Sequence, residues 1–182
     1  MARHLGLKSA SLLLLLCWAA PTRAQDAGVA EAPAAGVPRY LPAMREVLEQ
    51  MQLAPMCETL SAARARCSVR HVDDEAQREI VLTLVYSDVT DTLYLFIPRL
   101  VQSTPEGTAT PALLRRLMEL NFQLLGPKFE WDPATGEVRL SAVLHTDSNL
   151  DRRALRSMVH TLLSVADRYQ PELTRLLDQA DE

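Results

Sequence analysis

Histidine side chains are obvious candidates for catalysis or metal binding, and this chain has four of them. They are His4, His71, His145 and His160, and no two have the HxH or HxxxH spacing that brings two imidazoles to one metal ion. His71 and His145 fall in segments with the alternation of strands, and His160 falls on the polar side of a helical pattern. We interpret all four as solvated or singly hydrogen-bonded side chains.

The other groups that could do chemistry also lack the required spacing. The acidic run Asp73-Asp74-Glu75 does not follow the DxDxDG pattern of a calcium loop and is typical of a solvated turn. Ser141 and Ser148 stand in no GxSxG elbow, and the chain has no GxGxxG motif or phosphate-binding loop. The sequence therefore predicts no catalytic residue, metal site or cofactor, which favours a binding or accessory protein over an enzyme.

The first two dozen residues have the organisation of a cleavable secretory signal peptide. Basic residues precede an apolar run over residues 11–20, and Thr22-Arg23-Ala24 places small residues at the cleavage positions. The apolar run is shorter than the roughly 20 residues that a membrane-spanning helix needs. We expect a Sec-type leader over residues 1–24 and a periplasmic or secreted product. An uncleaved anchor and cleavage after Ala20 are the alternatives.

Removal of this leader changes the charge of the chain. The 182 residues contain 19 basic and 23 acidic side chains, and three of the basic ones lie in the leader. The remaining 158 residues carry 16 basic against 23 acidic side chains, a net charge of −7. This excess of acids argues against nucleic acid or an anionic membrane as a partner. No second apolar run is long enough to span a bilayer after cleavage.

The cysteine count also becomes informative without the leader. Cys17 is removed, and Cys57 and Cys67 remain. An even pair in an oxidising compartment is typical of a disulfide. Their separation of ten residues is not that of paired zinc ligands, and a nucleophilic cysteine would need a nearby base and a reducing environment. We predict a Cys57–Cys67 disulfide, with two separate buried thiols as the alternative.

The first half of the domain has the pattern of a helix followed by strands. A flexible Ala- and Pro-rich linker over residues 25–39 leads to a helix over Tyr40–Leu53, and a short helical stretch is expected over Glu58–Ala65. Alternating or β-branched runs then predict three strands, over Cys67–Val72, Glu79–Tyr86 and Thr92–Ile97. The second run is apolar on both faces, which indicates a central strand, and Pro98 is expected to end the third.

The second half has the pattern of a helix, a hairpin and a long final helix. The predicted elements are a helix capped by Thr110, hairpin arms over Lys128–Asp132 and Glu137–His145, and a helix that Asp151 caps and Pro171 interrupts or kinks. The resulting order, α-β-β-β-α-β-β-α, predicts one α+β domain over residues 40–177, an antiparallel sheet of five strands with helices packed against it. An acidic tail follows over residues 178–182.

The predicted hairpin carries the candidate partner face. Phe129 and Trp131 alternate on its first arm, and Val138 and Leu140 alternate on its second. An apolar face of this kind packs in the core of its own domain, against a second copy of the chain, or against a peptide. We predict a peptide groove or a dimer face near these four residues and the second helix, with burial in the core as the alternative.

The chain from the second helix onward resembles the YbjN-like family. Three segments carry the resemblance: Leu117–Phe129 (LMELNFQLLGPKF), Asp132–Leu140 (DPATGEVRL) and Ala166–Leu173 (ADRYQPEL). This bacterial family is described as sensory-transduction regulators and is grouped with the type III secretion chaperone-like fold. The resemblance implies the same α-β-β-β-α-β-β-α order. It also implies a protein without catalytic residues that binds unfolded segments of client proteins, often as a homodimer.

These patterns and the resemblance predict an exported, non-enzymatic domain that binds a protein or peptide partner. It would act by holding a client or as a regulator, and as a homodimer. The alternative is an envelope domain that senses a small ligand or stress and signals through a partner protein. A hydrolase would instead require a cleft that places His145 or His160 beside a carboxylate and a nucleophile.

Overall fold

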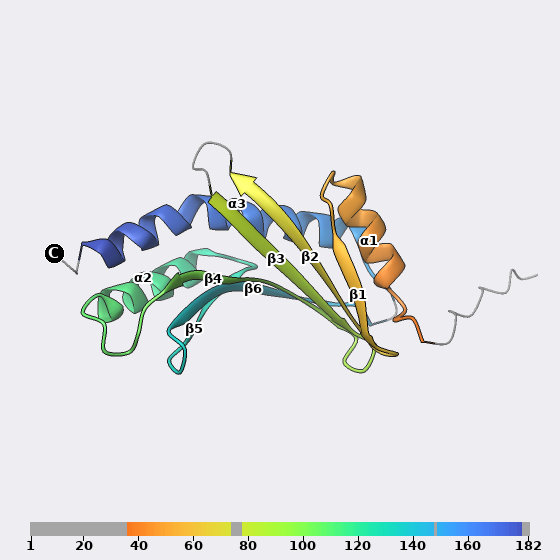
Figure 1. Cartoon of the computed structure of the whole chain (residues 1–182), viewed down its shortest axis with the longest axis horizontal. Coiled ribbons are helices and arrows are strands. Elements are labelled where there is room, and N and C mark those ends of the chain that lie inside the picture. Colours follow the sequence, from red (N-terminus) through yellow and green to blue (C-terminus); the bar gives the residue numbers. More distant parts are fainter. Residues whose placement is uncertain (1–35, 74–77, 148, 180–182) are drawn as a thin grey trace, which may run out of the picture. The chain divides into compact units, whose positions relative to one another are not determined.

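A computed structural model of the chain describes residues 36–73, 78–147 and 149–179. In these residues the chain forms three helices and six strands (Figure 1). Their order is α1 (Leu41–Gln50), β1 (Met56–Ser61), β2 (Arg64–Asp73), β3 (Arg78–Ser87), β4 (Thr92–Gln102), α2 (Thr110–Gln123), β5 (Lys128–Asp132), β6 (Glu137–His145) and α3 (Arg152–Asp178). The predicted leader over residues 1–24, and the predicted linker up to residue 35, lie outside the described residues.

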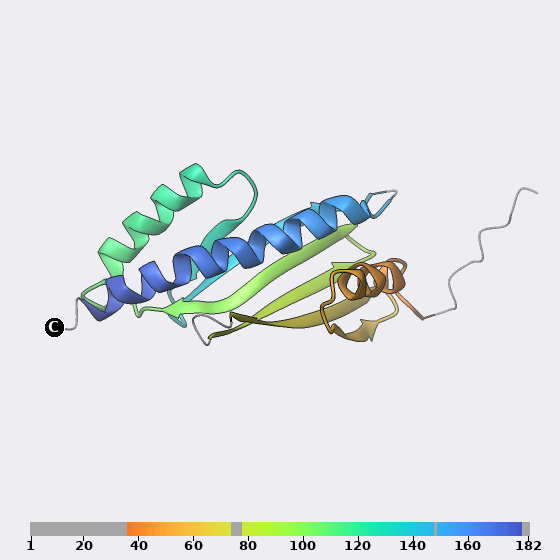
Figure 2. The same ribbon diagram turned by 90° about the horizontal axis from the view of Figure 1, so that it is seen from above.

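The strands form one antiparallel sheet in the order β1-β2-β3-β4-β6-β5. Figure 2 shows α1 and α3 over one face of this sheet and α2 at its β5 end. The predicted α+β class, the order of the predicted elements and the central position of β3 are therefore confirmed. Across the described residues, no helix is both long enough and apolar enough to span a bilayer.

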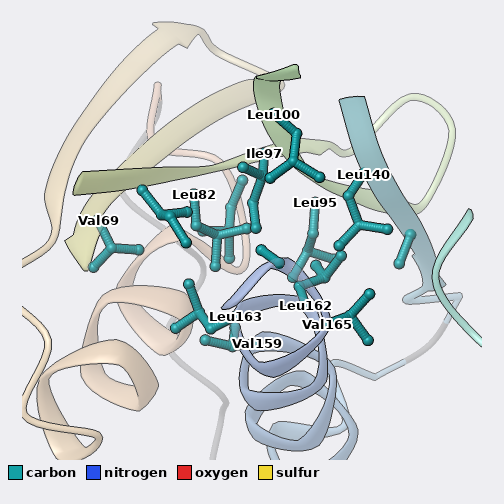
Figure 3. Packing of buried hydrophobic residues seen from close by; sticks show 14 of the residues in the cluster. Val69, Leu82, Leu95, Ile97, Leu100, Leu140, Val159, Leu162, Leu163 and Val165 are labelled. Atoms are coloured by element: carbon teal, nitrogen blue, oxygen red, sulfur yellow. The ribbon is translucent and has the colours of Figure 1, made fainter. Parts of the chain in front are cut away.

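The core lies between α3 and the sheet. The 3.6-residue period of α3 places Val159, Leu162 and Ala166 on one buried stripe. The period of two in the strands buries Leu82 and Leu95, which Figure 3 shows on the sheet side of the core that also contains Val159 and Leu162. All five side chains are fully buried. The burial of these apolar side chains makes the main favourable contribution to the free energy that holds the helix on the sheet.

The helical stretch predicted over Glu58–Ala65 is wrong. The segment forms β1 and the start of β2, which makes six strands where five were expected. Glu and Ala favour a helix, but that preference is only a few tenths of a kcal/mol per residue. Cross-strand pairing of Glu58 with Arg66, and of Cys57 with Cys67, opposes it and determines the structure.

Two prolines do not end their elements as predicted. The register of β4 against β6 shifts between Ile97 and Val101, so Pro98 lies outside the paired residues. Its missing N–H therefore breaks no hydrogen bond between these strands. Pro171 lies inside the continuous helix α3, where it leaves the carbonyl of Asp167 without its helical partner. The Asp167 carbonyl instead accepts a hydrogen bond from Nη2 of Arg78 at 3.4 Å. The helix therefore continues past Pro171.

The two predicted helix caps have different outcomes. Asp151 caps α3, because its Oδ1 accepts hydrogen bonds from the backbone N–H groups of Arg153 and Ala154 at 2.8 and 2.9 Å. Thr110 is instead the first residue of α2, and its hydroxyl donates to the carbonyl of Thr104 at 2.5 Å. The hydroxyl therefore fixes the preceding loop rather than the free N–H groups of the helix.

Candidate partner-binding surfaces

The two cysteines lie opposite each other on β1 and β2. The structure joins Cys57 and Cys67 by a disulfide with an S–S distance of 2.01 Å. Cys67 is fully buried, whereas Cys57 is half-buried and is the least exposed residue of β1. The disulfide therefore attaches an otherwise exposed edge strand to the core.

The predicted partner face on the hairpin belongs to the core of the chain. Phe129, Val138 and Leu140 have exposed fractions of 5%, 0% and 0%. Trp131 is half-buried, and its indole N–H donates to the carbonyl of Ser103 at 3.0 Å. Phe129, Val138 and Leu140 are therefore not available to a partner in the folded chain, in agreement with the core alternative, whereas Trp131 remains partly accessible.

The reason for this burial is the packing of α2 and α3 against β5. The side chain of Asn121 on α2 donates to the carbonyl of Phe129 at 3.0 Å and accepts from its N–H at 2.7 Å. The ring of Tyr169 on α3 meets the Phe129 ring edge to face, with 6.5 Å between ring centroids. A sequence pattern shows which residues share a face of a hairpin, but these contacts from distant elements determine what covers it.

Exposed apolar side chains concentrate on two other surfaces. Ten large apolar side chains are exposed among the described residues. Two of them lie on α2 and a third, Leu125, lies just after its end. Four others lie on strands, on the face of the sheet that points away from α1 and α3. Seven of the ten therefore belong to two surfaces, and large exposed apolar patches mark sites where partners bind.

The first surface, called here the open sheet face, crosses the sheet from β1 to β6. Its members alternate with core residues along each strand, so their side chains point away from the helices. They are Met56, Val72, Val81, Val85, Tyr94, Phe96 and Val143. Cross-strand register makes three of them direct neighbours, because Val85 pairs with Tyr94 and Tyr94 pairs with Val143.

Aromatic contacts occupy the middle of the open sheet face. The rings of Tyr94 and Phe96 stack with 5.0 Å between centroids, and the guanidinium of Arg139 lies 5.8 Å from the Phe96 centroid. Glu130 accepts hydrogen bonds from the hydroxyls of Tyr94 and Ser141 at 2.9 and 2.6 Å. Burial raises the pKa of the Tyr94 phenol, and the Glu130 hydrogen bond acts in the same direction. The phenol is therefore uncharged at neutral pH, and Arg139 and Glu130 bring one charge of each sign to the centre of the face.

The charged groups around this centre are largely paired. Arg66 forms an ion pair with Glu58, and Arg70 forms one with Glu79 at 3.0 Å. At the end of β3 a hollow of about 480 Å³ opens, with Val85 and the strongly exposed Val89 in its lining. The open sheet face therefore offers apolar surface without a strong field of either sign.

The second surface, called here the α2 stripe, consists of Met118, Phe122 and Leu125. Their exposed fractions are 69%, 92% and 102%, and their spacing places them along one side of the α2 segment and its exit. Arg116 holds α2 against α3 by an ion pair with Glu172 at 2.5 Å, and its hydrogen bond lowers the pKa of the Glu172 carboxyl. The stripe is therefore presented from a helix that is fixed in place.

Among the described residues, the candidate metal ligands do not gather into one site. In the parts of the chain that the structure describes, no three His, Cys, Asp or Glu side chains gather as metal ligands. Nε2 of His71 lies 3.1 Å from Oδ2 of Asp167, a contact that joins β2 to α3. His160 shares its groove with arginines and a serine rather than with a carboxylate.

Two solved structures are similar to this chain, and the first of them agrees with this architecture. The chain is similar to the structure described as the ExsC–ExsE complex, with 19% sequence identity and a TM-score of 0.51 over 75% of this chain and 97% of that one. It is also similar to the structure of the HopA1–SchA chaperone–effector complex, at 13% identity and a TM-score of 0.49 over 72% and 93% of the two chains. No curated protein sequence matches the chain.

A family profile gives the more specific result. The profile of the Tir chaperone protein (CesT) family matches residues 76–170, which are 95 of the 182 residues. This match supports the type III secretion chaperone-like fold that the resemblance implied, while the narrower YbjN-like assignment is not confirmed. Since the profile covers more than half of its length, the chain belongs to the Tir chaperone protein (CesT) family.

Proposed function

We propose that this protein is an exported, non-enzymatic chaperone that holds a segment of a client protein on the open sheet face. The observation that carries the proposal is the set of apolar side chains on the helix-free side of the sheet, with exposed Val81 and Val143 at 36% and 49%. Membership of the CesT chaperone family supports binding of a protein client rather than catalysis.

The surface suits an extended, unfolded segment better than a small ligand. Its apolar side chains spread over strands from β1 to β6, well beyond the hollow at the end of β3. A client side chain placed on it gains about 25 cal/mol for each Å² of apolar surface removed from water. An extended segment collects such contacts one after another, and the edge strands β1 and β5 each leave one row of backbone groups for further pairing.

The proposed location is the periplasm or the exterior of the cell. The leader expected over residues 1–24 supports export, and so does the Cys57–Cys67 disulfide, since disulfides persist in oxidising compartments. Cell fractionation with an antibody, together with N-terminal sequencing of the product, tests this part. A cytoplasmic product that still carries the leader would contradict it.

We also propose that the protein forms a homodimer, but through a different face from the predicted hairpin. Phe129, Val138 and Leu140 of the hairpin are buried, but the α2 stripe presents three strongly exposed apolar residues in one row. A two-fold contact between copies would bury both stripes at once, because such an interface uses the same patch on each subunit. The dimer face is therefore proposed on α2 rather than on β5 and β6.

A holding assay with matched variants tests the client role. Wild-type protein is expected to suppress light scattering by a thermally unfolded test protein. The double variant Val81→Ser/Val143→Ser should need roughly thirtyfold more protein for the same effect, because two apolar contacts of about 1 kcal/mol each are lost. The control Val37→Ser removes an equally exposed valine that lies before α1. Equal activity of all three proteins would refute the assignment of the client to this face.

A further inference from the structure

A third candidate surface lies where α1 ends beside the first turns of α3 (Figure 2). Glu46 on α1 pairs with Nη1 of Arg152 at 2.6 Å, and Gln50 accepts a hydrogen bond from Nη2 of Arg156 at 3.1 Å. These contacts hold the helices side by side. A groove continues beyond them and is lined by Gln50, Met51, Arg153, Arg156, Ser157 and His160.

The cations of this groove are incompletely neutralised. Arg156 donates to the neutral amide of Gln50, and the Glu46 carboxylate is engaged by Arg152. Among the described residues, the guanidinium of Arg153 has no hydrogen bond or ion pair, and no carboxylate lines the groove. The groove is therefore positively charged on a chain whose net charge is −4.

The placement of these arginines is electrostatically unfavourable for the chain alone. Cations near the start of a helix oppose the helix dipole, and α3 has no acidic residue in its first turn. The backbone N–H groups of Arg153 and Ala154 are already satisfied by the Asp151 carboxylate. The anion-attracting groups of the groove are therefore the arginine side chains, which an acidic partner would neutralise.

We propose that the α1–α3 groove binds an acidic peptide segment of a protein partner. Carboxylates of the segment pair with Arg153 and Arg156, and an apolar side chain beside them contacts Met51. Charge complementarity favours such a peptide, whereas the acidic body of the protein repels a long nucleic acid. The groove lies on the helical layer rather than on the open sheet face, so this inference goes beyond the proposed client site and does not depend on it.

Fluorescence anisotropy on the mature protein tests the groove. The probe is a short fluorescein-labelled peptide that alternates glutamate and leucine, and its twin carries glutamine in place of each glutamate. Wild-type protein is expected to bind the acidic probe about tenfold more tightly than the twin, and added salt should weaken that binding. Arg153→Gln and Arg156→Gln should each weaken it about two- to fivefold, the range expected for one exposed ion pair.

Two matched controls separate a specific role of the groove arginines from a general effect of net charge or of the open sheet face. Arg45→Gln changes the net charge equally on an exposed position of α1 outside the groove, and it should bind the acidic probe as the wild type does. Val81→Ser/Val143→Ser should also bind it normally. Equal affinity for the two peptides, unchanged affinity of Arg153→Gln/Arg156→Gln, or an equal loss in either control would overturn the proposal.

Discussion

The disulfide between β1 and β2 gives a prediction whose size follows from the structure. Five of the six β1 residues are exposed, and the half-buried Cys57 is bonded to the fully buried Cys67. The two cysteines are ten residues apart, and closing a loop of this length stabilises a fold by about 2 to 3 kcal/mol through the entropy of the unfolded chain. Breaking the bond should therefore loosen β1 first.

The perturbation is Cys57→Ala, which removes the crosslink and leaves Cys67 in the core. For a domain of this size, a loss of about 2 to 3 kcal/mol corresponds to a fall of about 8 to 12 °C in Tm. Reducing the wild-type protein with dithiothreitol should produce a similar fall without any change of side chain. Met56→Ala, the neighbouring exposed position on β1, serves as the matched control and should leave the Tm nearly unchanged.

Hydrogen exchange shows where the loss occurs. Amides of β1 should exchange faster in Cys57→Ala, whereas those of β3 and β4 should change only with the global stability. A Tm within about 2 °C of the wild type, or equal acceleration in all strands, would refute the reasoning, because β1 would then be held by something other than the disulfide.

Three further predictions concern the core, the charge pairs and α2. Leu162→Ala, at a fully buried position opposite the sheet, should lower the free energy of unfolding in urea by about 3 to 5 kcal/mol. The Glu172 carboxyl has a lowered pKa beside Arg116, so its contribution is present above its unfolded pKa and lost as the pH falls through the folded one. The Tm advantage of the wild type over Glu172→Gln should accordingly shrink between about pH 5 and pH 3, and a constant difference would contradict the assignment. Phe122→Ser/Leu125→Ser should shift the protein from dimer to monomer in light scattering after size exclusion, and a monomeric wild type would rule out the proposed α2 contact.

Elements with a strong local signal were predictable from sequence. The arms of the hairpin begin and end where predicted, because alternation and the turn residues of Asp132–Gly136 act within a few residues. The start of α3 was equally clear, since Asp151 caps it directly. The continuation of α3 past Pro171 was not, because the compensating donor Arg78 lies far away in the chain.

The open sheet face shows why the site itself was harder to predict. The apolar residues Val81 and Val85 were correctly taken to indicate a central strand with two apolar faces. A central strand can have its second face covered by another layer or left open, and the local pattern is the same in both cases. The contrast with Phe129 is informative, because its apolar face was expected to meet a partner and is covered by α2 and α3. Which face is covered depends on where the helices pack, and this information is not local.

Site-specific photocrosslinking in the native cell envelope tests the central claim most directly. A photoreactive amino acid replaces Val143 on the open sheet face in one protein and Thr174, an exposed position on α3, in another. We predict a discrete crosslinked client protein, identified by mass spectrometry, from position 143 and not from position 174. Loss of this adduct in the Val81→Ser background would confirm the shared surface. The absence of any adduct at 143, or the same adducts from both positions, would contradict the account.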